Sequence, residues 1–297
     1  MKLIRPITYA ETQLISSTAT ETYATWLIGT TYTLAQRVQY GTRIYESLVA
    51  GNVGFQPDTN PTKWLDYSPD NKHAMFDTQV STQTTRTTSL TTVVKPGVNF
   101  NSLAFLNILG TTLNVTVQEG IAGSTVYSKS ISLDDTIIID LYTYFFEPYD
   151  FKTEVVLTDI PPYASGTVTT TLTASTGNPV AIGSFVAGTV YTLGGTQYGA
   201  TVGIKDYSVK TTDTYGTTTF VQRAFSKRMD ATVYVDAPTL NFNYKLLSDM
   251  RAVPAVWIGS DSEALKPLIV FGYYRDFNVN IQYPTYSLCT LSIEGLT

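Results

Sequence analysis

Apolar and polar residues alternate with a period of two along much of the chain, a pattern typical of β-strands that have one buried face. The alternation is clearest in residues 113–119 and 125–133. Gly120 and Gly123 lie between these runs and predict a turn, so the two runs are expected to form a hairpin. We therefore expect a mainly β fold made of antiparallel β-sandwich domains and a small N-terminal β module.

Two further runs add strands to this picture. Residues 136–141 contain three consecutive isoleucines and predict a buried strand, whereas residues 153–159 predict a half-buried strand of the same pair of sheets. Helical spacing of apolar residues is found in residues 239–251, for example at Leu240 and Leu247. One short helix is expected there.

The length of the chain and its prolines predict several structural units. A single hydrophobic core stops growing at roughly 250–300 residues, and this chain has 297. Pro161 and Pro162 are expected to interrupt a sheet because proline has no amide hydrogen to donate. The expected segments are an N-terminal arm (residues 1–20), a small β module (21–76), a β-sandwich domain (77–162) and a second β-rich domain (163–297).

Aromatic residues recur through the expected small module. Trp26 and Trp64 lie near its two ends and are expected to pack together, because a core this small needs large side chains to close it. The order of its aromatic and turn residues resembles the family 5/12 carbohydrate-binding module, a small chitin-binding β fold. The residues that carry the resemblance are Trp26, Tyr32, Val38, Tyr40, Tyr45, Pro57 and Trp64.

This resemblance implies sugar binding through exposed aromatic rings, and the carbohydrate-binding candidates are Tyr32, Tyr45 and Trp64. The chain departs from the family at residues 46–51, where chitin binders usually supply further aromatic platforms and this chain has none. Two interpretations therefore stay open: a sugar-binding module, and a scaffold that displays or docks a partner. Exposed coplanar rings would favour the first, and buried Trp26 and Trp64 would favour the second.

Composition favours contact with other proteins over contact with nucleic acid. The chain has 21 Tyr and 13 Phe, and charged residues make up 14% of it, below the roughly 25% of an average soluble protein. The formal net charge of −5 argues against a phosphate-binding face. Arg223, Lys227 and Arg228 form a small basic cluster, which we interpret as a solvated strand edge or a subunit contact.

Few residues in the sequence suggest catalysis. His73 and Cys289 are the single histidine and the single cysteine, so neither a zinc set nor a typical Ser-His-Asp triad is expected. Cys289 lies in an alternating run and is interpreted as a small buried hydrophobe. We expect no enzyme activity, no metal and no cofactor.

Glycoside hydrolases use a pair of carboxylates, so acidic pairs were considered as catalytic candidates. The pairs are Asp134 with Asp135, Asp206 with Asp213, and Asp261 with Glu263. All lie in turn-like segments, where Asp usually caps or ends a strand. The acidic turn at residues 206–213 lacks the register of a standard calcium-binding loop.

The C-terminal part of the chain resembles uncharacterised virion and tail proteins of tailed bacteriophages. The resemblance is carried by residues 256–259, 268–277 and 283–297, which end in a strand with Cys289 and Glu294. It implies a structural component of the phage particle, in the tail, baseplate or neck. The partners it implies are other virion proteins, copies of the same chain in a symmetric assembly, and in one alternative a host surface glycan.

Three functional hypotheses follow. The first is a virion structural protein that is assembled in the host cytoplasm and acts through edge strands and aromatic patches. The second is a host-glycan or receptor-binding protein that uses the aromatic residues of the module, and the third is a polysaccharide-cleaving enzyme. No stretch approaches the roughly 20 apolar residues of a membrane-spanning helix, so no membrane insertion is expected. Tyr142, Tyr144, Phe145, Phe146 and Tyr149 are interpreted as core plus assembly surface.

Overall fold

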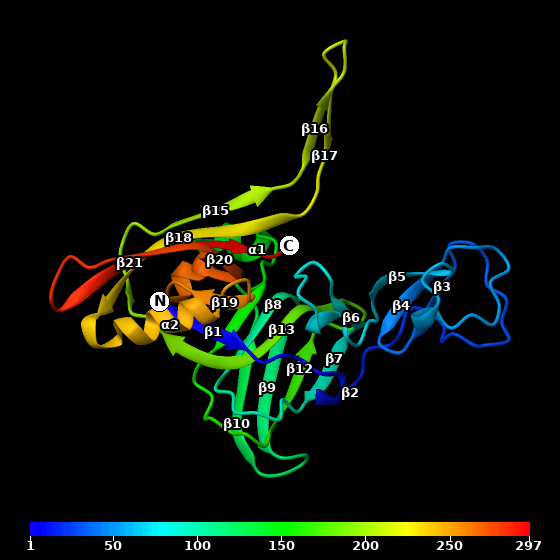
Figure 1. Cartoon of the computed structure of the whole chain (residues 1–297), viewed down its shortest axis with the longest axis horizontal. Coiled ribbons are helices and arrows are strands. Elements are labelled where there is room, and N and C mark those ends of the chain that lie inside the picture. Colours follow the sequence, from blue (N-terminus) through cyan, green and yellow to red (C-terminus); the bar gives the residue numbers. More distant parts are fainter.

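The chain folds into antiparallel sheets, and the predicted mainly β class is confirmed. The computed structural model describes residues 1–297, apart from the side chains of residues 263 and 264. Its largest sheet spans two hydrophobic cores, and a smaller sheet packs against one end of it (Figure 1). A small module stands at one side of this body, and a long hairpin projects away from it (Figure 1).

The first core lies in a β-sandwich. One layer has the strand order β10-β9-β12-β7-β2. Its strands are β2 (Leu14–Ser17), β7 (Ser89–Val94), β9 (Thr112–Glu119), β10 (Thr125–Ser132) and β12 (Gly166–Thr173). The facing layer belongs to the large sheet and consists of β6 (Thr84–Thr87), β8 (Ser102–Leu109), β11 (Glu154–Leu157) and β13 (Pro179–Thr192).

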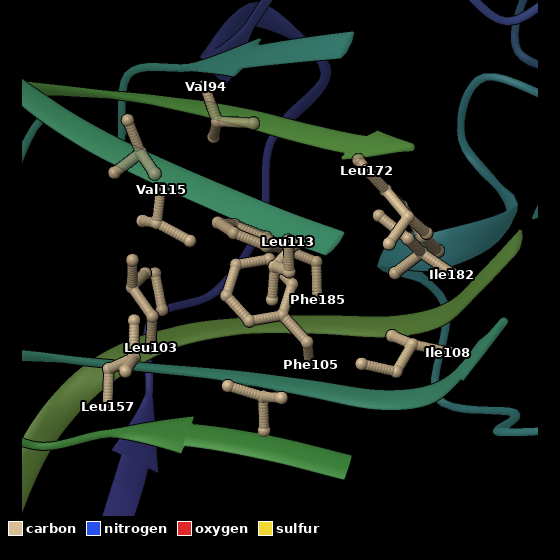
Figure 2. Packing of buried hydrophobic residues seen from close by; sticks show 14 of the residues in the cluster. Val94, Leu103, Phe105, Ile108, Leu113, Val115, Leu157, Leu172, Ile182 and Phe185 are labelled. Carbon is tan, nitrogen blue, oxygen red and sulfur yellow. The ribbon is translucent and has the colours of Figure 1, made fainter. Parts of the chain in front are cut away.

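Alternating side chains fill the space between these layers. Leu113, Val115 and Val117 of β9 are fully buried, while the residues between them face outward. They meet Phe105 and Phe185 from the opposite layer, whose rings are 5.4 Å apart between centroids (Figure 2). The predicted hairpin of residues 113–119 and 125–133 is confirmed as β9 and β10.

The second core lies on the other half of the large sheet, where the strand order continues β13-β1-β19-β20-β21-β18-β14, and β15 also pairs with β18. The strands are β1 (Lys2–Pro6), β14 (Gly195–Thr196), β15 (Thr201–Asp206), β18 (Phe225–Asp236), β19 (Ala255–Ile258), β20 (Ile269–Asn280) and β21 (Tyr286–Gly295). Trp257 of β19 is fully buried, and its indole Nε1 donates a hydrogen bond to the carbonyl oxygen of Gly272 at 3.0 Å.

Helix α2 (Leu240–Asp249) covers this core, and the predicted helix at residues 239–251 is confirmed. Leu246 and Leu247 pack into the core together with Met250, which follows the helix. Tyr244 of this helix is largely exposed, and its ring contacts Phe277 edge-on at 5.7 Å between centroids.

Strand β13 joins the two cores because it is long enough to pair with strands in both halves of the sheet. Its first residues pair with β6 and its last with β1, while β8 runs along its other edge. At Gly188 the backbone of β1 comes so close that a Cβ atom would lie 2.3 Å from the carbonyl oxygen of Arg5. Only glycine allows this approach.

The expected segments contribute to shared sheets. Residues 1–20, expected as an arm, form β1 and β2, and β1 lies between β13 and β19. Strands from both sides of residue 162 pair with one another, as β8 does with β13 and β9 with β12. How the chain divides into units that fold alone stays a prediction.

The small module is a sheet of β3 (Arg37–Tyr40), β4 (Arg43–Ser47) and β5 (Trp64–Pro69). Asn71 fastens it to the body, since its side-chain amide donates to the carbonyl oxygens of Thr20 at 2.7 Å and Thr85 at 2.9 Å. The rings of Tyr9 and Phe76 also stack, with centroids 3.9 Å apart. The module therefore has a defined attachment.

The remaining elements are short. Hairpin β16 (Val209–Thr212) and β17 (Thr218–Val221) extends from the body, and α1 (Leu141–Phe146) lies in the loop between β10 and β11. The 3-10 helices are η1 (Glu11–Gln13), η2 (Pro57–Thr59), η3 (Ala74–Phe76), η4 (Ala237–Thr239) and η5 (Glu263–Leu268). No helix in the described part of the chain has the length and apolar character needed to cross a membrane.

The central position of β1 predicts that the N-terminal residues are essential to stability. Leu3 is fully buried in the second core, so Leu3→Ala is expected to lower the free energy of unfolding by about 2–5 kcal/mol. Urea unfolding followed by circular dichroism measures this change. Ile15→Ala, an equivalent truncation at a partly exposed site on β2, is the control and should cost less than half as much; equal losses would contradict the structural role of β1.

Candidate functional site

Two of the three carbohydrate candidates are core residues of the small module. Tyr32 and Trp64 are 4% and 2% exposed, and their rings meet at 68° with centroids 5.3 Å apart. The Trp64 indole Nε1 donates to the carbonyl oxygen of Phe55 at 2.8 Å. The Tyr32 hydroxyl accepts a hydrogen bond from the amide of Leu27 at 2.7 Å. These rings hold the module together and offer no open face for a sugar.

The third candidate, Tyr45, is half-buried on β4 and packs against the same core. Burial, followed by the nearby Asp66 carboxylate, raises the pKa of its hydroxyl. Trp26 also packs against the core, with its ring perpendicular to that of Tyr40 at 5.6 Å. The structure thus brings the predicted residues together as packing partners, not as a row of exposed rings.

The exposed aromatic rings of the module lie beside cations. The Arg37 guanidinium lies 3.7 Å from the centroid of the Tyr67 ring, and Lys63 lies 5.3 Å from that of Phe55. A cation over a ring occupies the face on which a sugar would stack. The spacing of aromatic residues predicted the module core but could not show which rings are covered.

The carboxylate pairs are engaged in local turns. Asp134 accepts hydrogen bonds from Thr136, which lowers its pKa, and Asp135 forms an ion pair with Lys266 at 2.9 Å. Asp213 accepts two backbone amide bonds within the tip of the hairpin. Asp206 accepts from Ser208, which lowers its pKa.

The third acidic pair is only partly described. Asp261 forms an ion pair with Lys2 at 2.8 Å. The Glu263 side chain lies outside the described residues, so the pairing of Asp261 with Glu263 stays a prediction. In the described part of the chain, no three His, Cys, Asp or Glu side chains gather as a metal site would require.

His73 and Cys289 both have structural surroundings. His73 Nδ1 lies 2.6 Å from an Asp70 carboxylate oxygen, in the 3-10 turn that links the module to the body. Cys289 is buried on β21 in the second core, and burial raises the pKa of its thiol to about 11.

The longest run of exposed apolar side chains lies in the loop that carries α1. Residues 136–141 were expected to form a buried strand, and this prediction is wrong: Ile137 and Ile139 are 77% and 79% exposed. Asp140 instead caps α1, because its carboxylate accepts a hydrogen bond from the amide of Thr143 at 2.7 Å. The helix begins directly after the isoleucines, which lie in an irregular segment that leads into it.

We call residues 137–149 the aromatic loop. Its aromatic residues were interpreted as core plus assembly surface, and the structure places all of them on the surface. The large apolar side chains that it exposes are Ile137, Ile138, Ile139, Leu141, Tyr142, Tyr144, Phe145, Phe146 and Tyr149. They pack on one another, as Tyr142 does on Phe146 with ring centroids 5.0 Å apart, and leave their outer faces uncovered.

A second uncovered segment is the hairpin of β16 and β17, which stands clear of the body (Figure 1). Every residue of both strands is exposed, including Phe220 at 72%. Tyr215 at its tip is 94% exposed. The sequence analysis noted only an acidic turn at residues 206–213, and nothing in the sequence pattern indicated a hairpin that no layer covers.

Comparisons with known proteins give one weak structural similarity. No protein-family model matches the chain, and no curated protein matches it. A chitosan-binding module 1 from a chitosanase/glucanase of Paenibacillus sp. IK-5 superposes with a TM-score of 0.27 and 14% identity, over 40% of this chain and 83% of that one. A selenomethionine-labelled point mutant of that module gives 0.27 and 13%, over 39% and 82%.

The burial of Trp64 predicts a structural effect of its replacement. Trp64→Ala is expected to destabilise the module by about 3–5 kcal/mol, because it removes the largest side chain of a small core. Hydrogen exchange of β3–β5 peptides, followed by mass spectrometry, should show faster exchange. Leu65→Ala, on the exposed face of the same strand, is the control and should change exchange little; unchanged exchange in Trp64→Ala would contradict the core role.

Cys289 predicts a loss of stability at high pH. The thiol pKa is about 11 in the folded chain and near 9 when unfolded, so its contribution is complete below about pH 9 and is lost as pH rises through about 11. The advantage of wild type over Cys289→Ala should shrink by about 2–3 kcal/mol across this window. Urea unfolding of both proteins measures it, and a difference that does not vary with pH would contradict the prediction.

Proposed function

We propose that the chain is a structural component of a tailed phage particle, in the tail, baseplate or neck, and that it acts through protein–protein contacts. The observation that carries the proposal is the aromatic loop, whose apolar side chains the folded chain leaves uncovered. Exposed apolar patches larger than a few hundred Å² usually mark interaction sites. The phage particle as the setting rests on the resemblance of residues 256–259, 268–277 and 283–297.

Two other features support an assembly role. The projecting hairpin exposes both faces of its strands. Exposed strands of this kind can pair or pack with another chain, so the hairpin fits an assembly role. Strand β15 presents its outer edge, since β18 is its one partner strand among the described residues. In this proposal the protein is assembled in the host cytoplasm, resides in the virion and has no catalytic activity.

The alternative, binding of a host glycan by the small module, has weaker support. Tyr32 and Trp64 are buried, and the exposed rings of Tyr67 and Phe55 lie beside cations. Of the predicted residues only half-buried Tyr45 would then remain for contact with a sugar, unless a change of conformation exposes the core. No geometric feature of the module favours it over the assembly role.

Quantitative mass spectrometry of purified particles tests the proposal. Particles of the source phage are washed in high salt, and the copies of this chain are counted against the major capsid protein. A fixed, small number of copies per particle is expected, because structural components occupy symmetric positions. An abundant host protein of similar mass is the control for adherent contaminants. The proposal would be overturned if washing removed this chain to the same extent as the host protein.

A further inference from the structure

We propose that the aromatic loop docks into the pocket at the base of the projecting hairpin of a second copy of this chain. The inference rests on the proposed assembly role and adds to it the contact surface and the partner. It joins two features of the same molecule: an exposed apolar projection, and an apolar hollow that lies close to where the projection leaves the body.

The projection is a defined structure, not a loose segment. Its base is closed by hydrogen bonds from the Asp135 amide to the Asp150 carbonyl oxygen at 2.9 Å and from the Lys152 amide to the Leu133 carbonyl oxygen at 2.7 Å. The ion pair of Asp135 with Lys266 ties the base to the body. The aromatic side chains are therefore presented on an ordered support, which limits the entropy lost when they bind.

The area of the aromatic loop suits a stable protein contact. Its uncovered apolar side chains expose on the order of 1,000 Å², which exceeds the largest patch of a typical monomer and is close to the ~800 Å² that each partner buries in a standard interface. Burial of even half of this area would be strongly favourable at ~25 cal/mol per Å² before the costs of association.

The hollow is a cavity of about 320 Å³ where the ends of β8, β11, β18 and β20 meet. Its apolar lining includes Leu106, Phe225, Phe271 and Leu296. A cavity of ~150 Å³ lined by similar side chains holds one benzene molecule, so this one has room for two aromatic rings. Phe225 is half-exposed at 53%, which leaves part of the lining open to a partner.

One cation near the cavity can complement the acidic loop. Residues 134–150 contain five acidic residues and no Lys or Arg. Lys227 lines the cavity together with its ion-pair partner Glu154, and Arg223 lies two residues before Phe225. Among the described residues, Arg223 has no carboxylate within ion-pair distance. Glu147, beside Phe146 on the loop, has the sign to meet it.

The position of the two features favours a second copy of this chain over another occupant. Thr153 and Glu154, which line the cavity, lie four and five residues after the loop, so the loop leaves the body close to the cavity. A surface that carries both is self-complementary, as a two-fold symmetric interface requires. The acidic rim of the loop disfavours an anionic lipid surface.

Sedimentation velocity of the full chain, at about 1 to 100 μM, tests the proposal. Wild type should self-associate, and the double change Phe145→Ser with Phe146→Ser should weaken association at least about tenfold. So should Phe225→Ser at the rim of the cavity. The matched control is Tyr215→Ser with Phe220→Ser, which removes two equally exposed rings from the hairpin and should leave association unchanged.

Mixing the two variants is a further test, because variants that had misfolded could not restore association in each other. The loop variant keeps an intact cavity, and the Phe225→Ser variant keeps an intact loop, so an equimolar mixture should form mixed dimers that neither forms alone. Circular dichroism melts of all variants verify the fold. The proposal would be overturned if wild type stays monomeric, or if the loop variant associates like wild type. It would also be overturned if wild type floats with phosphatidylcholine vesicles and the loop variant does not, because the loop would then bind a membrane.

These outcomes are separate from that of the particle measurement. A monomeric chain that is present at fixed copy number in washed particles would overturn the self-contact and leave the assembly role standing, with another virion protein as the partner. A chain that self-associates through the loop but is absent from particles would leave the self-contact standing and overturn the role in the particle.

Discussion

Strand β13 is the constraint on which the rest of the fold depends, because both cores use it. Its apolar residues face the sandwich core at one end, and it pairs with β1 at the other, where the second core begins. The approach of β1 at Gly188 leaves no space for a side chain. The two ends of the sequence are thereby fixed in one sheet: β1 sits between β13 and β19, and β19 leads on to the C-terminal strands.

A body held together in this way is well suited to carry projections. The aromatic loop and the hairpin leave the sheets at strand ends and bury little of their own surface, so neither contributes much to the stability of the cores. Their apolar side chains are a cost to solubility unless another surface covers them. The small module is different, since its aromatic residues pack in its own core. Asn71 fixes its attachment to the body.

The sequence predicted what depends on local pattern. Alternation located the hairpin of residues 113–133 and strand β11, and helical spacing located α2. The paired tryptophans indicated a small core near Trp64. It failed at residues 136–141, because a run of three isoleucines is the same in a buried strand and in an exposed loop. The N-capping preference of Asp140 was the available signal, and the pattern of isoleucines outweighed it.

Burial of individual rings could not be read from the sequence, since it depends on contacts between strands distant along the chain. The resemblance to a sugar-binding module gave the order of aromatic residues, but Tyr32 and Trp64 lie in the module's interior. In the aromatic loop, by contrast, rings that the sequence suggested as partly buried lie on the surface. Its tyrosines and phenylalanines are of the type that fills cores, yet the chain places an acidic residue at each end of α1 and closes the base of the loop with two backbone hydrogen bonds. Apolar side chains on an ordered, acidic-rimmed support suit a protein partner with an apolar hollow. This chain has such a hollow near the base of the loop, lined in part by Lys227 and its partner Glu154.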